Sequence, residues 1–408
     1  MSGSKFISSR LFSFSRGSLS STVMRLSVTS VALAVTVALI SLAVVVGFKN
    51  QIRDKVVGFV APIHIQTMDR NESYEEMPFV ISERLQQALE STPGIKHYQG
   101  VANKAGMIKT DEEIQGVITK GVGADYDWSF FEKCLIAGEL PRYTDGERSN
   151  DVMVSKLIAD RMLLEVGDDV RVWFIDEDMK ARGRKFTVKG IYETGLSEEY
   201  DERYMFCDIN QIRKLNHWDD NEIGLVEVWL DDIEMMDQVN NKLRYSIPVD
   251  LDSHSARESN PQIFDWLSLL DTNVWLILAL MFLVAGITVI SMLLIIIIEK
   301  TSTIGLLKAM GASNGFVRKV FLRRSIRILV IGMVIGNIVG LGFCFLQQYT
   351  GLIRLNPETY YLSAVPIELP TAMIIAVELI FFGLWTLMLL IPTAIINRIR
   401  PSRSIRFE

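Results

Sequence analysis

Side chains that commonly carry catalysis or bind metals are few and scattered in this 408-residue chain. The histidines do not recur at a spacing typical of metal ligands. They stand at His64, His97, His217 and His254. The block 49–271 contains no G-x-S-x-G or H-E-x-x-H motif, and the chain has no G-x-x-x-x-G-K-S/T phosphate loop. We therefore expect no catalytic residue, no metal site and no cofactor bound by this chain.

Cysteine chemistry is limited to three residues. Cys134 and Cys207 fall in the same polar block, where one disulfide or two free thiols fit the sequence equally well. Cys344 falls inside an apolar run and is expected to pack there.

The most specific local pattern is EKTSTIGLLKAMGA, residues 299–312. Ile304, Leu307 and Lys308 share one face of a short predicted helix, which leaves small and apolar side chains on its other faces. Two interpretations fit this pattern equally. The helix either docks in a groove of a cytoplasmic partner protein, or lies on the cytoplasmic surface of the membrane as an ordinary amphipathic helix.

The ends of this helix are also marked in the sequence. Gly311 can terminate it, because glycine tolerates a positive φ. Ser313 or Asn314 can then cap the helix that follows.

Four long apolar runs must position these segments. Each can cross a hydrocarbon core of roughly 30 Å, at about 1.5 Å of rise per residue. The runs are 26–48, 274–298, 328–346 and 371–396, and only the last carries a charge, Glu378. We predict four transmembrane helices, the first a retained span because it is too long for a signal peptide and lacks a small-x-small cleavage site.

Lysine and arginine near the span ends predict the orientation. They are concentrated in the N-terminal segment 1–25, the loop 299–327 and the tail 397–408, whereas the loop 347–370 has a single basic residue. Both termini and the middle loop are therefore expected in the cytoplasm. The block 49–271 is expected on the opposite, extracytoplasmic side of the membrane.

This extracytoplasmic block is acidic, with 43 Asp and Glu against 26 Lys and Arg. Such a charge would repel phosphate, which excludes nucleic-acid binding as its role. Strands and helices alternate irregularly in its pattern, so we predict an α+β domain between the first two spans. Predicted strands cover 152–154, 170–174, 186–191 and 226–230, and predicted helices cover 79–89, 155–164 and 233–243. Both ends of the block look helical, so the first two spans are expected to continue as stalks.

Two features stand out inside the predicted spans. Gly332, Gly336 and Gly340 form a small-xxx-small stripe, which suits either packing within one chain or a seam between two chains. Glu378 is an intramembrane carboxylate that could face a water-filled cavity, pair with a polar group or reach toward the surface. We assign it no proton-relay role.

These residues together resemble a known family. One span, a large external domain and three further spans are the layout of type VII ABC transporter permeases, the FtsX/MacB-like superfamily. Residues 299–312 resemble its coupling-helix motif, and 152–172 and 186–208 resemble its MacB-like periplasmic core domain. Residues 354–369 (RLNPETYYLSAVPIEL) and Phe6–Phe14 resemble the lipoprotein-releasing LolC/LolE branch.

The resemblance implies a non-catalytic subunit of the bacterial inner membrane, with the block 49–271 in the periplasm, that works with other chains. It would pair with a second permease chain, as a homodimer or a LolC/LolE-type heterodimer, and bind two copies of a LolD-like ATPase that holds ATP and Mg. The pair would extract lipoproteins from the outer leaflet and hand them to a LolA-like periplasmic carrier. Force would pass through the spans to the external domains, which is mechanotransmission.

The resemblance also implies roles for particular residues. Those expected to contact the ATPase are Glu299, Lys300, Thr301, Ile304, Gly305, Leu306, Leu307, Lys308, Ala309, Met310, Gly311 and Ala312. Those expected to line a cavity shared by substrate and membrane lipid are Val44, Val45, Val46, Phe48, Trp275, Leu276 and Leu280.

Two departures from the family pattern are visible. Ser302 and Thr303 stand where the coupling motif often has an arginine and a carboxylate. The turn Asp176–Arg184 is short and lacks proline, so carrier recruitment is not assigned to it. Competing hypotheses are an FtsX-like regulator of cell-wall hydrolases, a MacB-like export permease, and a membrane-anchored sensor without ATP coupling.

Overall fold

The computed structural model describes residues 19–68, 75–110, 113–175, 180–196 and 200–398. The chain forms two compact units. We call them the helical unit, with the chain up to Lys49, Trp266–Arg354 and the chain from Ala364 on, and the sheet unit, with Asn50–Asp265 and Leu355–Ser363. Helices α2 (Leu19–Val60) and α9 (Pro261–Glu299) contribute residues to both units. The segment Phe6–Phe14 and most of the predicted tail 397–408 lie outside the described residues.

Four helices of the described chain are long and apolar enough to cross a membrane, by length and composition. They are Thr22–Val60, Pro261–Glu299, Asn314–Thr350 and Thr371–Ile396, which confirms the four predicted spans. Helix α2 continues past residue 48 to Val60, and α9 begins at Pro261, well before residue 274. The prediction that both tethers are helical is therefore also confirmed.

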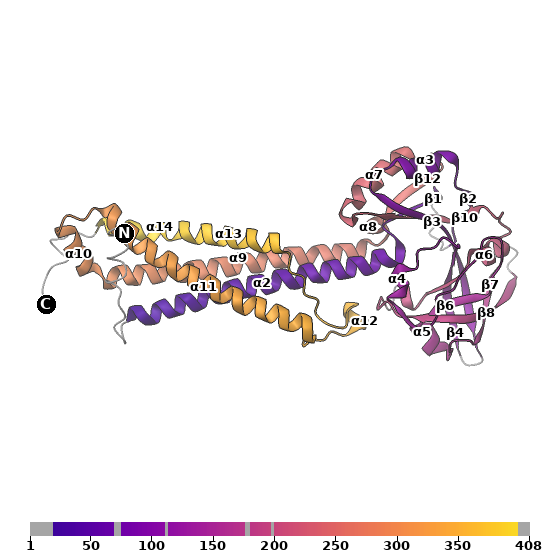
Figure 1. The fold of residues 1–408 in the computed structure, drawn as a ribbon, viewed down its shortest axis with the longest axis horizontal. Helices are drawn as coiled ribbons and strands as arrows, with labels where there is room; N and C mark the ends of the chain where they lie inside the picture. The colour runs from indigo at the N-terminus through magenta and orange to yellow at the C-terminus, as the bar shows by residue number, and fades with distance from the viewer. Residues whose placement is uncertain (1–18, 69–74, 111–112, 176–179, 197–199, 399–408) are drawn as a thin grey trace. The chain divides into compact units, whose positions relative to one another are not determined.

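The long helices of the helical unit lie side by side (Figure 1). Buried side chains from all of them form its apolar core. Trp385 on α13 (Thr371–Met388) is fully buried at its centre. The indole Nε1 donates a hydrogen bond of 3.1 Å to the carbonyl of Phe282 on α9, and the two rings stack with centroids 6.2 Å apart. This contact fixes the fourth span against the second.

The glycine stripe lies where α11 (Asn314–Thr350) crosses α2. A Cβ added at Gly336 would lie 2.6 Å from the carbonyl oxygen of Ala32, and one at Gly332 would lie 2.8 Å from the Val31 side chain. Thr36 on α2 donates a hydrogen bond of 3.0 Å to the Gly336 carbonyl. Of the two predicted alternatives, the structure shows packing within one chain.

The fourth span is broken near its end. Helix α13 ends at Met388, α14 covers Leu390–Thr393, and a 3₁₀ turn, η3, covers Ala394–Arg398. The break falls four residues before Pro392, where the proline ring would clash with the carbonyl at position i−4 and has no N–H to donate.

The sheet unit is built on a ten-stranded sheet with the order β12-β1-β11-β3-β4-β9-β6-β8-β5, in which β7 pairs with β3 and β8. The pairs β4–β9 and β6–β8 are parallel and the others are antiparallel, a mixed sheet that confirms the α+β prediction. The strands are β1 (Ile63–Thr67), β3 (Ile95–Lys109), β4 (Ile114–Val122), β5 (Leu135–Gly138), β6 (Asp151–Ser155), β7 (Asp169–Ile175), β8 (Ala181–Tyr192), β9 (Tyr204–Asp208), β11 (Leu225–Leu230) and β12 (Leu251–Ser255).

Short helices connect these strands. They are α3 (Glu83–Ser91), α4 (Ser129–Glu132), α5 (Lys156–Met162), α6 (Ile209–Asn216), η2 (Ile233–Met235), α7 (Met236–Ser246), α8 (Ala256–Ser259) and α12 (Pro357–Tyr360). The four predicted strands and the helices near 155–164 and 233–243 are confirmed.

The predicted helix over 79–89 is wrong at its start. Phe79–Val80 forms β2, which pairs with β10 (Glu222–Ile223) in a separate two-stranded sheet. Helix α3 begins only at Glu83, because the Ser82 side chain accepts a hydrogen bond of 3.3 Å from the Leu85 amide and caps it there.

Replacing Gly336 by leucine is expected to destabilise the helical unit by roughly 1–3 kcal/mol, because the new side chain forces α11 away from α2. The measurement is thermal unfolding of the purified chain in detergent. Gly342→Leu is the matched control on the same helix, since nothing lies within 4 Å of a Cβ built there. Equal losses in the two variants would contradict close packing at this seam.

Candidate functional site

The predicted coupling segment folds as a short helix, α10 (Thr301–Ala309), directly after α9. Gly311 has φ +91°, and its amide donates to the Lys308 carbonyl, so the helix ends where the sequence predicts. The Ser313 side chain accepts from the Phe316 amide at 3.3 Å and caps α11. Two turns of helix are thus held between two long helices.

The two faces of α10 have different surroundings. Ile304 and Gly305 are buried, and Ile304 belongs to the apolar core of the helical unit. Leu306 is 54% exposed and Met310 is 77% exposed. Ala309 is exposed beside them. The residues expected to contact an ATPase therefore divide into an outer face and an inner face.

Lys308 ties this helix to the end of the fourth span. Its Nζ donates a hydrogen bond of 2.5 Å to the carbonyl of Ile396 in η3. Leu307 is half-buried next to it, and Glu299 and Lys300 form a 3.5 Å ion pair where α9 ends. Of the remaining predicted residues, Thr301 donates its hydroxyl to the Ile297 carbonyl where α10 begins. The amides of Gly311 and Ala312 donate to the carbonyls of Lys308 and Leu307 where the helix ends.

The residues expected to line a substrate cavity do not share one environment. In α2, Val45 and Val46 pack against the main core of the helical unit and Val44 against a smaller cluster. Phe48 makes an edge contact with Trp266 of α9, with ring centroids 5.7 Å apart. The predicted residues on α9, by contrast, are more than half exposed: Trp275, Leu276 and Leu280.

Glu378 lies in a narrow crevice between α13 and α2. Its neighbours there include Leu39, Leu42 and Phe381. The free volume of about 10 Å³ is roughly that of a single water position. Glu378 makes no hydrogen bond with any residue that the structure describes. Within one chain the site is a crevice and not a large cavity.

The sheet unit holds the last turn of α2 in an aromatic cluster. Phe59 is 1% exposed. Five rings surround it at centroid distances between 4.8 and 6.5 Å, those of Phe131, Tyr192, Tyr200, Tyr204 and Phe206. A helix end packed on several sides cannot rotate without disturbing the core around it.

A buried ion pair reinforces this attachment. Lys120 Nζ lies 2.5 Å from Glu227 Oε1, and the side chains are 4% and 2% exposed. The same ammonium group lies 3.4 Å from the Phe59 carbonyl, while Gln99 donates to the second Glu227 oxygen at 2.9 Å. The pair therefore links the end of α2 to strands β4, β11 and β3. Sequence reasoning missed these residues, because an isolated Lys and Glu 107 positions apart give no local signal.

Lys55 ties together three segments of the sheet unit. Its Nζ donates to the carbonyl of Thr194 at 2.7 Å and to that of Tyr361 at 2.8 Å. Tyr361 belongs to the loop before the fourth span, so this loop is joined to α2. Asp201 stabilises the segment at Thr194, because its carboxylate accepts hydrogen bonds from the Thr194 and Gly195 amides. Burial raises the pKa of Asp201 despite these bonds.

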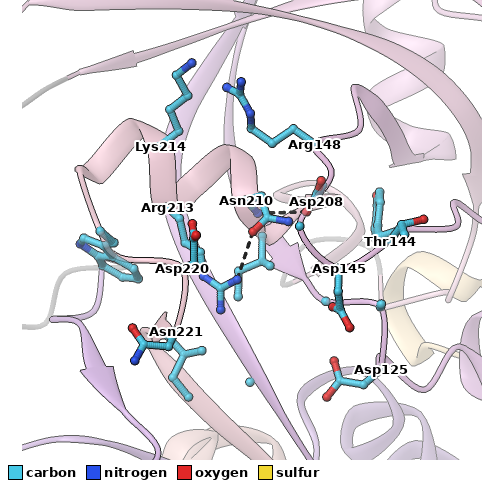
Figure 2. Close-up of a pocket in the computed structure, with 18 of the residues that line it drawn as sticks. Asp125, Thr144, Asp145, Arg148, Asp208, Asn210, Arg213, Lys214, Asp220 and Asn221 are labelled. Carbon is cyan, nitrogen blue, oxygen red and sulfur yellow. Dashed lines mark hydrogen bonds between the residues drawn. The ribbon is translucent and has the colours of Figure 1, made fainter.

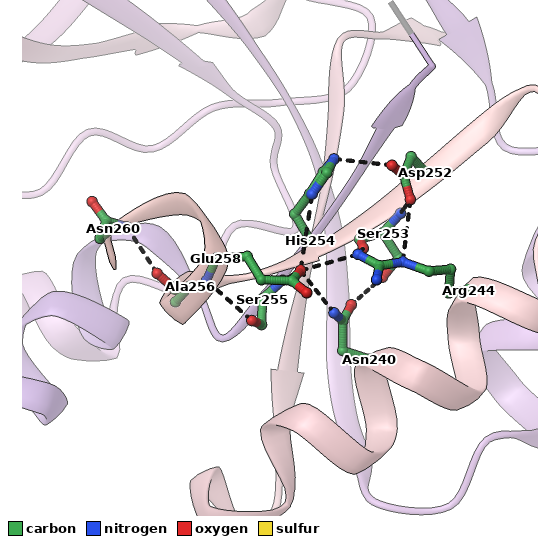
Figure 3. A network of polar contacts seen from close by, with 9 residues as sticks. All are labelled: Asn240, Arg244, Asp252, Ser253, His254, Ser255, Ala256, Glu258 and Asn260. Carbon is green, nitrogen blue, oxygen red and sulfur yellow. Dashed lines mark hydrogen bonds and ion pairs between the residues drawn. The ribbon is translucent and has the colours of Figure 1, made fainter. Parts of the chain in front are cut away.

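A second polar network lies where the chain leaves the sheet unit toward α9 (Figure 3). Arg244 contacts Asp252 at 3.4 Å and Glu258 at 3.0 Å, and Asn240 donates to Glu258 at 3.1 Å. Ser255 and Glu258 also form a capping box on α8. The network fixes the short segment that precedes Pro261.

The dispersed histidines and cysteines form no common site. Cys134, Cys207 and Cys344 are free thiols. Of the histidines, His254 faces Asp252 at 3.3 Å. Burial lowers the pKa of His64 to about 4, so this imidazole is neutral. Within the described ranges no three His, Cys, Asp or Glu side chains are grouped to hold a metal ion.

Four apolar helices with an α+β domain inserted between the first two define the class: a candidate membrane-spanning protein with one large inserted domain. Residues 25–245 match the model of the MacB-like periplasmic core domain, and residues 275–401 match the FtsX-like permease C-terminal model. The chain belongs to the family of FtsX-like permeases that carry a MacB-like periplasmic core domain.

Several full-length relatives support this membership. The chain is 24% identical to the lipoprotein-releasing system transmembrane protein LolC of Neisseria meningitidis over 412 residues, 96% of each chain. It is 24% identical to LolC of Xylella fastidiosa, again over 96% of each chain, and 20% identical to LolE of Haemophilus influenzae over 88% of each.

Two solved domains also match part of the chain. The extracellular domain of YknZ, an ABC-type transporter from Gram-positive bacteria, is 16% identical with a TM-score of 0.32, over 47% of this chain and 99% of that domain. The periplasmic region of MacB from Actinobacillus actinomycetemcomitans is 13% identical with a TM-score of 0.34, over 52% of this chain and 95% of that region.

Replacing Lys120 by methionine is expected to cost roughly 3–5 kcal/mol of stability, because Glu227 would keep a buried and uncompensated charge. Denaturant unfolding of the purified chain measures the loss. Adding Glu227→Gln should recover part of it.

The control for this variant is Lys185→Met. The Lys185–Asp169 pair has a 2.7 Å contact but is 64% and 54% exposed, so its loss should cost less than about 1 kcal/mol. If the two lysine variants were equally stable, the buried pair would not be what holds the end of α2.

Proposed function

We propose that this chain is the permease subunit of an ABC transporter that releases lipoproteins from the bacterial inner membrane. The observation that carries this proposal is the similarity to LolC across 96% of both chains. ATP would be hydrolysed, with Mg, by two copies of a separate LolD-like ATPase. A second permease chain, identical or of the LolC/LolE type, would complete the transporter.

The chemistry of the task explains why a motor is needed. Moving an acyl chain from lipid into water costs about 0.8 kcal/mol per CH₂ group. A lipoprotein with several long chains cannot leave the outer leaflet for a soluble carrier without an energy source. In this proposal a LolA-like carrier receives the lipoprotein, and the permease converts ATP hydrolysis into the movement that releases it.

The outer face of α10 suits a contact with the ATPase. Leu306, Ala309 and Met310 form an exposed small and apolar surface, while Ile304 and Gly305 seat the helix in the core. A force applied to the outer face of α10 would therefore be transmitted to the apolar core. A bulky residue at Gly305 would disturb that seating, so it is a poor probe of the contact itself.

The two departures from the family pattern bear on the contacts proposed with the ATPase and with the carrier. Ser302 is exposed on the outer face of α10, so a hydroxyl would meet the ATPase where the family often has a charged side chain. Of the turn Asp176–Arg184, residues 176–179 lie outside the described residues and β8 begins at Ala181. We assign no carrier contact to it.

Changing Leu306 and Met310 together to glutamate is expected to abolish co-purification of the ATPase and ATP-dependent lipoprotein release. The reason is that two buried carboxylates would replace the apolar contact surface. Release is measured in proteoliposomes that hold both proteins and a triacylated lipoprotein, with purified carrier outside. Val249→Glu, at a residue 83% exposed in the sheet unit, is the control and should keep both activities.

The outcomes separate the competing functions. Normal ATPase binding by the double variant would contradict the role of α10. A wild-type chain that binds the ATPase and supports ATP hydrolysis, yet releases no lipoprotein, would favour an FtsX-like regulator or a MacB-like exporter. A wild-type chain that leaves the ATPase rate unaltered would favour a sensor.

The proposed orientation is tested separately. In a cysteine-free chain, Met310→Cys should react with an impermeant maleimide only after the cytoplasmic side is opened. Val249→Cys should react in cells whose outer membrane alone has been made permeable. Labelling of Met310→Cys from the periplasmic side would reverse the predicted topology and remove the proposed ATPase site.

A further inference from the structure

The sheet unit contains a cavity of about 780 Å³ that the transport mechanism above does not use (Figure 2). Its walls come from α6, from the loops around residues 123–125 and 143–148, and from the two-stranded sheet of β2 and β10. This volume lies within the range of roughly 300–1,000 Å³ that is usual for ligand pockets. The cavity is lined by both charges and apolar side chains.

Arg213 is held rigidly in this cavity. Its Nε donates to the Glu222 carbonyl at 2.8 Å, and its Nη1 donates to Asn210 Oδ1 at 3.1 Å. Its Nη2 makes no hydrogen bond with any of the described residues. Partial burial lowers the pKa of Arg213, although the surrounding carboxylates oppose this. The guanidinium is therefore a preorganised cation with a free donor group.

Three carboxylates that line the cavity accept no side-chain hydrogen bond and form no ion pair within the described chain: Asp125, Asp145 and Asp220. All three act electrostatically on Arg213. Asp125 and Asp145 come from different loops and point toward each other (Figure 2). The fourth carboxylate, Asp208, is already occupied by the Ser149 and Asn210 amides at 2.7 and 2.9 Å.

The opposite end of the cavity is basic. Arg148 and Lys214 lie there, away from Asp125 and Asp145 (Figure 2). Neither forms an ion pair within the ranges that the structure describes. Trp218 is half-buried on one wall and offers a flat apolar surface. The site thus has an acidic end, a basic end, and a fixed hydrogen-bond donor between them.

Other ligand classes fit this arrangement poorly. A phosphate group would meet four aspartates, and their repulsion opposes anion binding. A metal ion would need three convergent ligands, and no such group exists among the described residues. A lipid tail would have to cover unpaired charges, which are costly to desolvate.

We infer that this cavity binds an extended polypeptide segment that carries a basic and an acidic side chain a few residues apart. The basic side chain would pair with Asp125 and Asp145, and the acidic one with Arg148 and Lys214. Arg213 would donate to a backbone carbonyl, and Trp218 would pack on the aliphatic parts of the segment.

The binding test uses the full chain in nanodiscs without ATPase. The probe is the blocked hexapeptide acetyl-Ser-Lys-Gly-Ser-Asp-Ser-amide, titrated by calorimetry, with an all-serine hexapeptide as the peptide control. Saturable binding of the mixed-charge peptide alone is expected. The double variant Asp125→Asn/Asp145→Asn and the single variant Arg148→Gln should each raise Kd at least tenfold.

Asp160→Asn is the control variant, because Asp160 is exposed on α5 and outside the cavity. It should bind like the wild type, and all variants should keep the wild-type melting temperature. Absence of saturable binding, equal binding of the all-serine peptide, or unchanged Kd values in the cavity variants would each overturn the inference.

The segment could belong to the transported lipoprotein or to the carrier, and this assignment rests on the proposed function. A photoreactive p-benzoylphenylalanine in place of Thr144, which lines the cavity, distinguishes them in the complete transporter. A cross-link to the purified lipoprotein or to the purified carrier identifies the source. A cross-link to neither overturns the assignment to a transport partner, whereas the titration decides peptide binding independently of the ATPase.

Discussion

Phe59 stands one residue before the end of a 42-residue helix, and aromatic rings from two strands and two short segments pack around it. Ring edges packed at these distances leave no room for the helix end to turn alone. The Lys120 ammonium adds a contact to the Phe59 carbonyl, where a helix end would otherwise have an unpaired acceptor. The last turn of α2 is therefore held firmly within the sheet unit.

A buried ion pair is an expensive way to hold a helix end, because both charges lose their hydration. Hydrophobic residues would give similar stability, but they would tolerate small slips of the helix against the sheet. The geometry of the Lys120–Glu227 pair is directional, and Gln99 and the backbone of Asp127 extend its hydrogen-bond network. We interpret the pair as a means of positioning α2 at the point where this helix enters the sheet unit.

The sequence predicts the elements better than the contacts between them. Apolar runs, Gly311 and Ser313 are local signals, so the four spans and the boundaries of α10 could be found without a structure. The helix that packs on the glycine stripe could not be identified from the sequence, because Gly336 is compatible with a second chain as well as with Ala32. Phe59, Lys120 and Arg213 were missed for the same reason, since each acquires its role from residues distant in sequence. The prediction for the segment that forms β2 was wrong because Phe79 also fits the spacing of a helix.

The two faces of α10 differ in a way that the proposed contact with a partner protein would explain. Ile304 is buried in the helical unit, yet Leu306 and Met310, only two and six positions later, remain exposed although they are apolar. The membrane can cover exposed residues such as Leu276 on α9, but α10 follows the span and bears charged neighbours at its start, Glu299 and Lys300. An apolar surface at that position is best satisfied by protein. The same helix is bonded through Lys308 to the end of the fourth span. A partner that binds its outer face therefore acts on two spans at once.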